Sequence, residues 1–382
     1  MRPVSIVGIN QIIVKKKNDT GLRDMAKEVA HGAMSDAGAD RVDALYVSNM
    51  LSDELQGQKH LAALFADQSG LAGIEALQIR AATASGAAAL RVGYLAIASG
   101  QVDSALIVGV EKMSGGIATP IIAKALDGLK EVPDGATLIS QNARLMKMYS
   151  RKYNPPPDAM AHFPVIAHQN AANNPFALFR DLQFTPSDVL ASRIISPPIR
   201  LFDCSPVCDG AAAVLLVPGD QAHQYKGRPI KILASSVATD RFRFAERPDP
   251  LMIEGAKLSA EKAFSQCAIG RDDISFFEVH DAFSIMACLS LEAAGYAQPG
   301  EAWRMAVEGQ LNIGGRLPIT TMGGLKARGH PIGASAIYQT CEIVLQMRGE
   351  AGPNQVKNAE FALMQSVGGV ASTVITHILG AS

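Results

Sequence analysis

The chain has 382 residues, of which 48% are apolar and 19% are charged, and its formal net charge at neutral pH is -1. Such a composition fills the cores of two or three globular domains and excludes a disordered or fibrous protein. The balanced charge argues against a nucleic-acid-binding protein but leaves room for a local basic patch that would hold one phosphorylated cofactor.

The first residues and the apolar runs predict neither export nor membrane insertion. Residues Met1–Asn10 hold too short an apolar stretch for a signal peptide, and no run approaches the ~20 apolar residues of a membrane span. The five cysteines are scattered, at Cys204, Cys208, Cys267, Cys288 and Cys341. This odd, irregularly spaced set indicates neither a disulfide framework nor a zinc site. We expect a cytoplasmic protein with reduced, mostly buried thiols and no bound metal.

Strands and helices are expected to alternate in residues 1–112. Apolar runs predict strands at Val4–Gly8, Ala44–Val47, Leu77–Ala81 and Ser104–Val110. Helical periodicity predicts helices at Gly21–Gly38, His60–Ser69 and Ala84–Ser99. This alternation is typical of an α/β fold with a buried, largely parallel sheet.

Residues 113–209 interrupt the alternation. The segment is rich in proline, including the run Pro155–Pro157, and it holds much of the chain's methionine and asparagine. Long irregular stretches of this kind commonly carry or cover functional sites. We interpret the segment as an inserted loop domain that covers one end of the sheet.

The α/β pattern resumes after residue 209. Strands are predicted at Ala211–Val217, Ile230–Ala238, Phe276–Val279, Phe361–Met364 and Ser372–Ile378, and helices at Leu251–Cys267, Ala282–Ala294 and Ala334–Met347. We assign residues 210–240 to the completion of the first half and residues 241–382 to a second half. Small residues at Thr83–Gly86 and at Pro331–Ala334 open a helix at comparable places in both halves. A duplicated α/β unit is therefore expected.

The loop Gly323–Ala334 is the first segment with a chemical character. Its glycines and Pro331 hold His330 in a tight turn just before a helix. A histidine beside the partial positive charge of a helix start can act as a base, an acid or a hydrogen-bond donor. The alternative is a surface histidine in an ordinary glycine-rich turn.

His280 stands at the end of a predicted strand, where open α/β sheets bind their ligands. The alternative is a purely structural His280–Asp281 pair at the start of a helix. Asp281 is expected to serve as the N-cap of that helix in either case.

Thr83 lies between a buried strand and a helix start, where a nucleophile elbow would place its nucleophile. A threonine hydroxyl needs an adjacent base before it can attack, and the alternative is that Thr83 only caps the helix Ala84–Ser99. A fourth segment, Ser366–Gly369, follows a predicted strand. Backbone N–H groups in such a turn can stabilise an oxyanion, or the segment can be an ordinary glycine turn.

Together these segments resemble the thiolase superfamily. The resemblance is carried by Gly323–Ala334, by Asp203–Pro206, by Asp209–Ala213, by Val108–Met113, and by His280–Phe283, which is similar to the variant of sterol-carrier-type and archaeal-type thiolases. It covers nearly the whole chain in the right order. It implies a thiolase fold, in which two half-domains pack beneath a loop domain that binds coenzyme A, and a homodimer or homotetramer that performs acyl transfer in lipid metabolism.

The resemblance also assigns roles. His330 falls on the histidine that activates the nucleophile, His280 on the histidine of an oxyanion hole, and Gly368 where a backbone N–H completes a second hole. The nucleophilic cysteine of the family is replaced by Thr83. The two further cysteine positions of the family hold Ser366 and Ala282. Cys288 lies two helical turns beyond His280 and is expected in the core.

Three functions remain open. In the first, His330 activates Thr83 and acyl transfer proceeds through an oxygen ester. In the second, His330 and His280 supply a base and an oxyanion hole for retro-aldol or enolate chemistry on a bound acyl-CoA, as in thiolase-like aldolases that act on sterol side-chain CoA esters. In the third, the protein is a non-catalytic acyl-CoA-binding scaffold. Archaeal-type thiolases resemble proteins that assemble with a small OB-fold companion and a hydroxymethylglutaryl-CoA synthase-like enzyme.

All three functions need acyl-CoA as substrate or ligand, with no permanently bound cofactor. Two basic groups are candidates for its phosphates. One consists of Lys147, Arg151 and Lys152, and the other of Arg241, Arg243 and Arg247. The sequence does not choose between them, and a solvated charged surface is the alternative for both.

Overall fold

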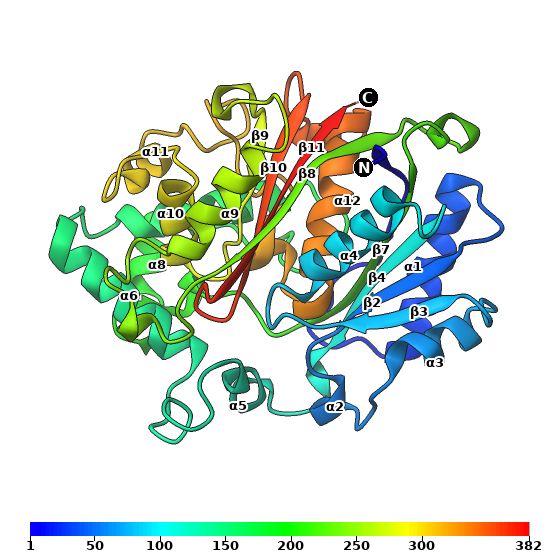
Figure 1. Cartoon of the computed structure of the whole chain (residues 1–382). Coiled ribbons are helices and arrows are strands. Elements are labelled where there is room, and N and C mark those ends of the chain that lie inside the picture. Colours follow the sequence, from blue (N-terminus) through cyan, green and yellow to red (C-terminus); the bar gives the residue numbers. More distant parts are fainter. Residues whose placement is uncertain (382) are drawn as a thin grey trace.

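A mixed nine-stranded sheet with helices on both faces forms the frame of the molecule in the computed structural model, which describes residues 1–381 (Figure 1). Its strands are β1 (Val4–Gln11), β2 (Ala44–Ser48), β3 (Glu75–Ile79), β4 (Ala105–Lys112), β7 (Asp209–Pro218), β8 (Ile230–Thr239), β9 (Phe276–Glu278), β10 (Phe361–Gly368) and β11 (Thr373–Ala381). They follow one another across the sheet in the order β3-β2-β4-β7-β1-β8-β11-β10-β9. Two short strands, β5 (Ile194–Ser196) and β6 (Ile199–Arg200), form a separate hairpin.

The sheet is not largely parallel, so that prediction is wrong. Parallel pairing is confined to β2 with β3 and β4, and to β9 with β10. The pairs β4–β7, β7–β1, β1–β8, β8–β11 and β11–β10 are antiparallel. Strands that follow one another without a crossover helix, such as β10 and β11, return antiparallel. Apolar runs in the sequence carry no information on direction, which depends on such connections.

Helices cover the sheet in layers. In the first half, α1 (Leu22–Ala37) and α3 (Leu61–Gln68) pack on one face of β1, β2, β4 and β7. In the second half, α9 (Glu254–Phe264) and α10 (Ser284–Ala293) pack on strand residues of β8, β10 and β11. Between them, α4 (Ser85–Ser99) and α12 (Ser335–Arg348) share one core with strands of both halves. Two helices thus lie in the middle of the molecule.

The central helices α4 and α12 lie side by side (Figure 1). Small residues line their contact and allow a close approach. A Cβ atom on Gly86 of α4 would lie 3.0 Å from the carbonyl oxygen of Gly333 and 3.1 Å from the Cβ of Ala336. A Cβ atom on Gly109 of β4 would lie 2.7 Å from the Cα of Ala334. A side chain at Gly109 would force a backbone shift, and one at Gly86 would press against its neighbours.

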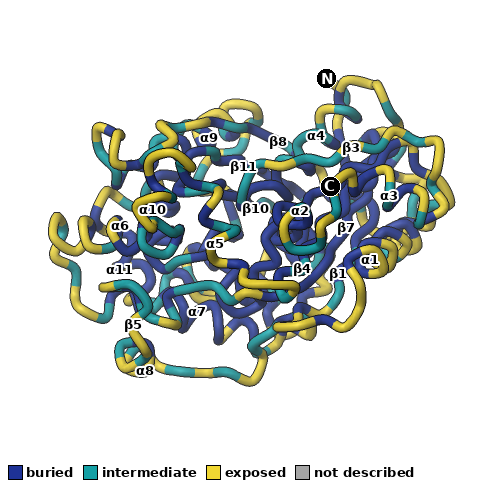
Figure 2. Tube along the Cα trace, turned by 90° about the horizontal axis from the view of Figure 1, so that it is seen from below, coloured by how far each residue is buried: buried dark blue, intermediate teal, exposed yellow. Residues whose placement is uncertain are grey.

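The inserted segment contributes α5 (Ala118–Ile122), α6 (Leu138–Tyr153), α7 (His162–Ala171) and α8 (Pro186–Ala191). Two short helices, α2 (Ser52–Leu55) and α11 (Ala302–Val307), complete the set of α-helices in the described chain. The insertion packs against the second half, where α6 contacts α10 and α7 contacts α11. Figure 2 shows that the inner strands such as β4 and β7 are buried, while exposed residues gather on α1, α8 and the connecting loops. No helix among residues 1–381 is long and apolar enough to cross a membrane.

Candidate active site

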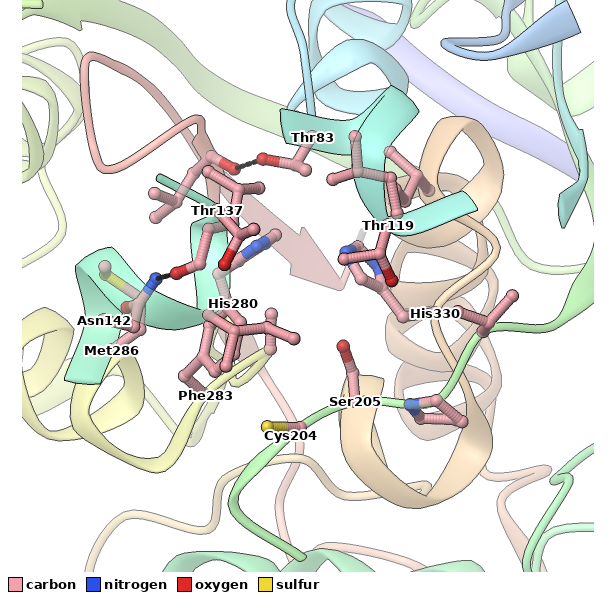
Figure 3. Close-up of a pocket in the computed structure, with 18 of the residues that line it drawn as sticks. Thr83, Thr119, Thr137, Asn142, Cys204, Ser205, His280, Phe283, Met286 and His330 are labelled. Atoms are coloured by element: carbon pink, nitrogen blue, oxygen red, sulfur yellow. Dashed lines mark hydrogen bonds between the residues drawn. The ribbon is translucent and has the colours of Figure 1, made fainter. Parts of the chain in front are cut away.

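A cavity of about 100 Å³ lies where the starts of α4 and α12 meet the inserted segment (Figure 3). Thr83, His280 and His330 all line it, although they are far apart in the sequence. Much of the remaining wall is apolar, with Met113, Ile122, Leu138, Phe283 and Met286 among its residues. The structure therefore brings three of the predicted site residues together.

His330 is held by its own loop. The preceding Gly329 has φ +114°, which favours glycine. The backbone N–H of His330 donates to Sγ of Cys208 at 3.1 Å, and its ring atom Nδ1 lies 2.7 Å from Oγ of Ser335. Its Nε2 atom has no hydrogen-bond partner in residues 1–381, and the side chain faces the cavity. Burial, helped by nearby His280, Arg328 and Lys326, holds the pKa of His330 well below its usual value. The ring is therefore neutral, so one of its two nitrogens carries a free lone pair.

His280 follows directly after β9 and meets His330 edge-to-face. Their ring centroids are 5.5 Å apart, with an angle of 86° between the ring planes. Burial, with a smaller contribution from the positive charge of Lys326, lowers the pKa of His280 to about 3. Two neutral imidazoles thus share one wall of the cavity (Figure 3).

Asp281 ties the two histidine loops together. Its carboxylate accepts hydrogen bonds from the backbone N–H groups of Leu325 at 2.7 Å and of Lys326 at 3.4 Å. The prediction that Asp281 caps the following helix is wrong, because the N-cap of α10 is Phe283, which makes no side-chain cap bond. A Cβ on Gly324 would lie 2.7 Å from both carboxylate oxygens, so this contact requires glycine. Because Asp281 bonds to the backbone of the loop that precedes His330, it fixes the position of His280 relative to that loop.

The Thr83 hydroxyl is already engaged by the backbone. Its Oγ1 donates to the carbonyl oxygen of Val367 at 2.6 Å and accepts from the N–H of Gly369 at 3.2 Å (Figure 3). Neither histidine is bonded to it in the described chain. The alternative that Thr83 caps α4 is also wrong, since the N-cap of α4 is Ala84, without a side-chain cap bond. The hydroxyl instead links the start of α4 to the end of β10 and the following turn through these two hydrogen bonds.

Backbone strain marks the turn before α4. Ala82, immediately before Thr83, has φ +49°, which is unfavourable for a residue with a Cβ atom. Strained turns between a strand and a helix can present a side chain at the top of a sheet. The turn thus has the backbone character of a nucleophile elbow, although its hydroxyl is paired.

Ser366 and Gly368 lie within β10 and not in a turn, because the strand continues to Gly368. Among residues 1–381, the cavity wall includes their neighbours Val367 and Gly369 but neither of these two. Gly368 packs tightly, and a Cβ there would lie 2.7 Å from the carbonyl oxygen of Ala81. The backbone N–H directed at Thr83 belongs to Gly369.

The three cations of the first basic group, Lys147, Arg151 and Lys152, have different surroundings. Lys147 and Arg151 border one surface hollow beside Pro197 and Pro198. Lys152 pairs with Asp249 at 2.8 Å.

The arginines of the other group are partly neutralised. Arg243 pairs with Glu246 at 2.7 Å, and Arg247 is buried and pairs with Asp240 at 3.0 Å. None of the candidate cations lines the cavity itself, as far as the described chain extends.

Sequence reasoning missed several residues of the cavity. Cys204 and Ser205 line it from the end of the insertion, and Asn142 from α6. Burial raises the pKa of Cys204 to about 12, so it is a neutral thiol. Cys204 falls in the segment Asp203–Pro206, whose resemblance to a family segment was the only signal in the sequence. Cys288 is in the core beside Tyr149, as expected.

Comparisons with known proteins show the family and the fold of the chain. The family model for the N-terminal domain of thiolase matches residues 4–182, and the model described as thiolase C-terminal domain-like matches residues 236–381. The chain is 40% identical to an acetyl-CoA acetyltransferase of Methanothermobacter thermautotrophicus, with 99% of each chain covered. It is 30% identical to sterol carrier protein 2 of Gallus gallus over 97% of this chain and 70% of that protein. The solved structure of an Ltp2-ChsH2(DUF35) aldolase has the same fold, with a TM-score of 0.87, 22% identity, and 99% and 98% of the two chains covered.

Proposed function

This chain belongs to the thiolase superfamily, and from that membership we propose that it binds an acyl-CoA in the cavity and acts on the α-carbon of the acyl group without forming an acyl-enzyme. The reaction we favour is the cleavage of a β-hydroxyacyl-CoA into an aldehyde or ketone and a shorter acyl-CoA, or the reverse addition. The hydrogen bonding of Thr83 carries this choice, because its hydroxyl proton is donated to Val367 and not to a base.

The two histidines can supply what this reaction needs. Nε2 of His330 takes the proton of the β-hydroxyl group, the Cα–Cβ bond breaks, and its electron pair moves into the thioester as an enolate. A ring N–H of His280 stabilises the enolate oxygen. After the carbonyl product leaves, the proton held by His330 returns to the α-carbon. Atoms and protons balance without a further reactant.

Acyl transfer through Thr83 is the second candidate, and its support is the relationship to an acetyl-CoA acetyltransferase. It would require Thr83 to leave Val367 and Gly369 and to give its proton to His330. Acyl transfer would thus have to break two hydrogen bonds of the hydroxyl before the attack. The paired hydroxyl therefore favours chemistry that leaves Thr83 in place.

A pure scaffold is disfavoured by the meeting of two neutral imidazoles in one cavity. Buried histidines without a protein partner at the cavity-facing nitrogen lose solvation and gain nothing for stability. Perturbed titratable groups gathered in a pocket are more typical of a reaction site.

For the nucleotide end of coenzyme A we propose the hollow beside Lys147 and Arg151. Helix α6 borders both places, since Asn142 lines the cavity and Lys147 borders the hollow. The two residues are about 1.4 turns apart, or about 7.5 Å along the helix axis. Lys152 and Arg243 already pair with acidic side chains and are weaker candidates. Arg241 remains a further candidate.

We also propose that the protein acts in the cytoplasm as a homodimer or homotetramer, with a small second protein as partner. The support for a partner is the similar aldolase of known structure, in which Ltp2 is named together with ChsH2 (DUF35). Light scattering after size-exclusion chromatography would give the number of copies. A mass consistent with a monomer at micromolar concentration would contradict the oligomer.

Two assays test the proposed chemistry. Exchange of the α-protons of acetyl-CoA in D₂O reports deprotonation by the protein without any second substrate. A panel of β-hydroxyacyl-CoA esters, with product aldehydes and ketones trapped as hydrazones, reports bond cleavage. We expect exchange and cleavage that are both lost in His330→Ala. Absence of both activities in the unmodified protein would overturn the proposal, and an acetyl ester on Thr83 after acid quench would select acyl transfer instead.

A further inference from the structure

We propose that Ser335 is a positioning residue that holds His330 as its Nδ1–H tautomer and thereby leaves Nε2 as the proton acceptor in the cavity. This inference rests on the proposed role of His330 as the base. Ser335 is the first residue of α12, is buried, and lies 2.7 Å from Nδ1 of His330.

The direction of the bond follows from counting hydrogens. The hydroxyl of Ser335 carries one hydrogen and also lies 2.9 Å from the carbonyl oxygen of Pro331, which can only accept. If that hydrogen goes to Pro331, the contact with His330 is a bond only when Nδ1 is the donor. If it goes to Nδ1, the hydroxyl oxygen and the Pro331 oxygen face each other at 2.9 Å without a hydrogen between them. The first arrangement makes two hydrogen bonds and the second makes one, so Nδ1 carries the proton.

The surroundings keep this chain of bonds in place. Nη2 of Arg328 lies 3.4 Å from the carbonyl oxygen of Ser335, and Nε of the same guanidinium pairs with buried Glu342 at 3.0 Å. The backbone N–H of His330 is fixed on Cys208 at 3.1 Å. Both ends of the His330–Ser335 bond are thus anchored to neighbouring segments.

Charged and titratable neighbours act on His330 but do not choose its tautomer. His280, Arg328 and Lys326 are the groups that shift its pKa, and Cys208 contacts its backbone. Within residues 1–381, the hydroxyl of Ser335 is the group in hydrogen-bond contact with Nδ1. A neutral histidine in the other tautomer would present N–H to the cavity and could not accept the substrate proton.

The test compares Ser335→Ala, which removes the hydroxyl, with Ser335→Thr, which keeps it. In protein labelled with ¹⁵N-histidine, the ring nitrogen shifts of His330, assigned by their loss in His330→Ala, report the tautomer. We expect Nδ1–H in the unmodified protein and in Ser335→Thr, and a mixture of tautomers in Ser335→Ala. For α-proton exchange we expect kcat of Ser335→Ala to fall about tenfold to a hundredfold, part of the ~10²–10⁴ that a positioned base supplies, with KM for acetyl-CoA unchanged.

Three results would overturn the inference. They are an Nε2–H tautomer of His330 in the unmodified protein, unchanged ring shifts in Ser335→Ala, or exchange by Ser335→Ala at the unmodified rate. The shifts are measured without turnover, so a protein that lacks both exchange and cleavage refutes the proposed function while the tautomer still tests Ser335. If Ser335→Ala does not fold, the shifts of the unmodified protein and of Ser335→Thr decide.

Discussion

Replacement of Thr83 by valine separates a structural hydroxyl from a nucleophile. Valine keeps the shape of the side chain but removes the bonds of 2.6 Å to Val367 and 3.2 Å to Gly369. Each such bond contributes about 1 kcal/mol net, and the Val367 oxygen loses its donor in a buried place. Gly369 borders the cavity, where water can replace the hydroxyl. We therefore expect the free energy of unfolding to fall by about 1–3 kcal/mol.

Activity should respond differently. Because Thr83 takes no part in the proposed reaction, α-proton exchange and cleavage should stay within about threefold of the unmodified protein, less than about 1 kcal/mol in barrier height. Urea unfolding gives the stability change, and NMR of acetyl-CoA in D₂O gives the exchange rate. Thr83→Ser, which keeps both hydrogen bonds, is the matched control for stability. A folded valine variant that lost both activities by about a thousandfold or more, as expected on removal of a nucleophile, would refute this reasoning.

Three further predictions concern the histidines and the basic hollow. His330→Ala should slow exchange by about 10²–10⁴-fold while acetyl-CoA still binds in calorimetry; a smaller loss would exclude His330 as the base. The lowered pKa values of His280 and His330 keep both rings unprotonated as pH falls through about 6.5, so the exchange rate should stay level from about pH 8 to about pH 5.5. A decline centred near the ordinary histidine pKa of about 6.5 would contradict it. Lys147→Glu and Arg151→Glu should each raise KM for acetyl-CoA by about tenfold, the loss of one charge-assisted bond. Lys152→Glu is the matched control, because Lys152 already pairs with Asp249, and an equal effect there would argue for a diffuse charge effect and against a binding site.

The elements of the fold were accessible from the sequence, because apolar periodicity is a local signal. The strand predicted at Ala44–Val47 is β2, and the helix predicted at Gly21–Gly38 is α1, whose C-cap is Gly38. Strand direction was not accessible, since it depends on how distant segments connect. For the same reason β10 extends to Gly368 beyond the predicted Met364, through pairing with β11.

Part of the candidate site could also be predicted from the sequence, and part of it could not. The residue types and turns around His280 and His330 indicated chemistry, and their resemblance to one family indicated that they belong together. The partners of Asp281 and Thr83 could not be predicted, because both side chains bond to backbone groups distant in the sequence, at Leu325 and Val367. Local rules predict caps for such residues at helix starts, and tertiary contacts overrode them here.

The glycine-lined contact between α4 and α12 has a consequence for how the protein could adapt to different substrates. The helix starts that carry Thr83 and His330 pack closely, since a Cβ atom on Gly86 would lie 3.0 Å from the carbonyl oxygen of Gly333. The closely packed part of the cavity wall is the part that carries Thr83 and His330. The inserted segment forms another part of the wall, with Ile122, Leu138 and Cys204. We expect differences in the acyl group that the cavity accepts to arise from this part. Under the proposed function, substitutions there would change the acyl group that fits the cavity while Thr83, His280 and His330 stay in place.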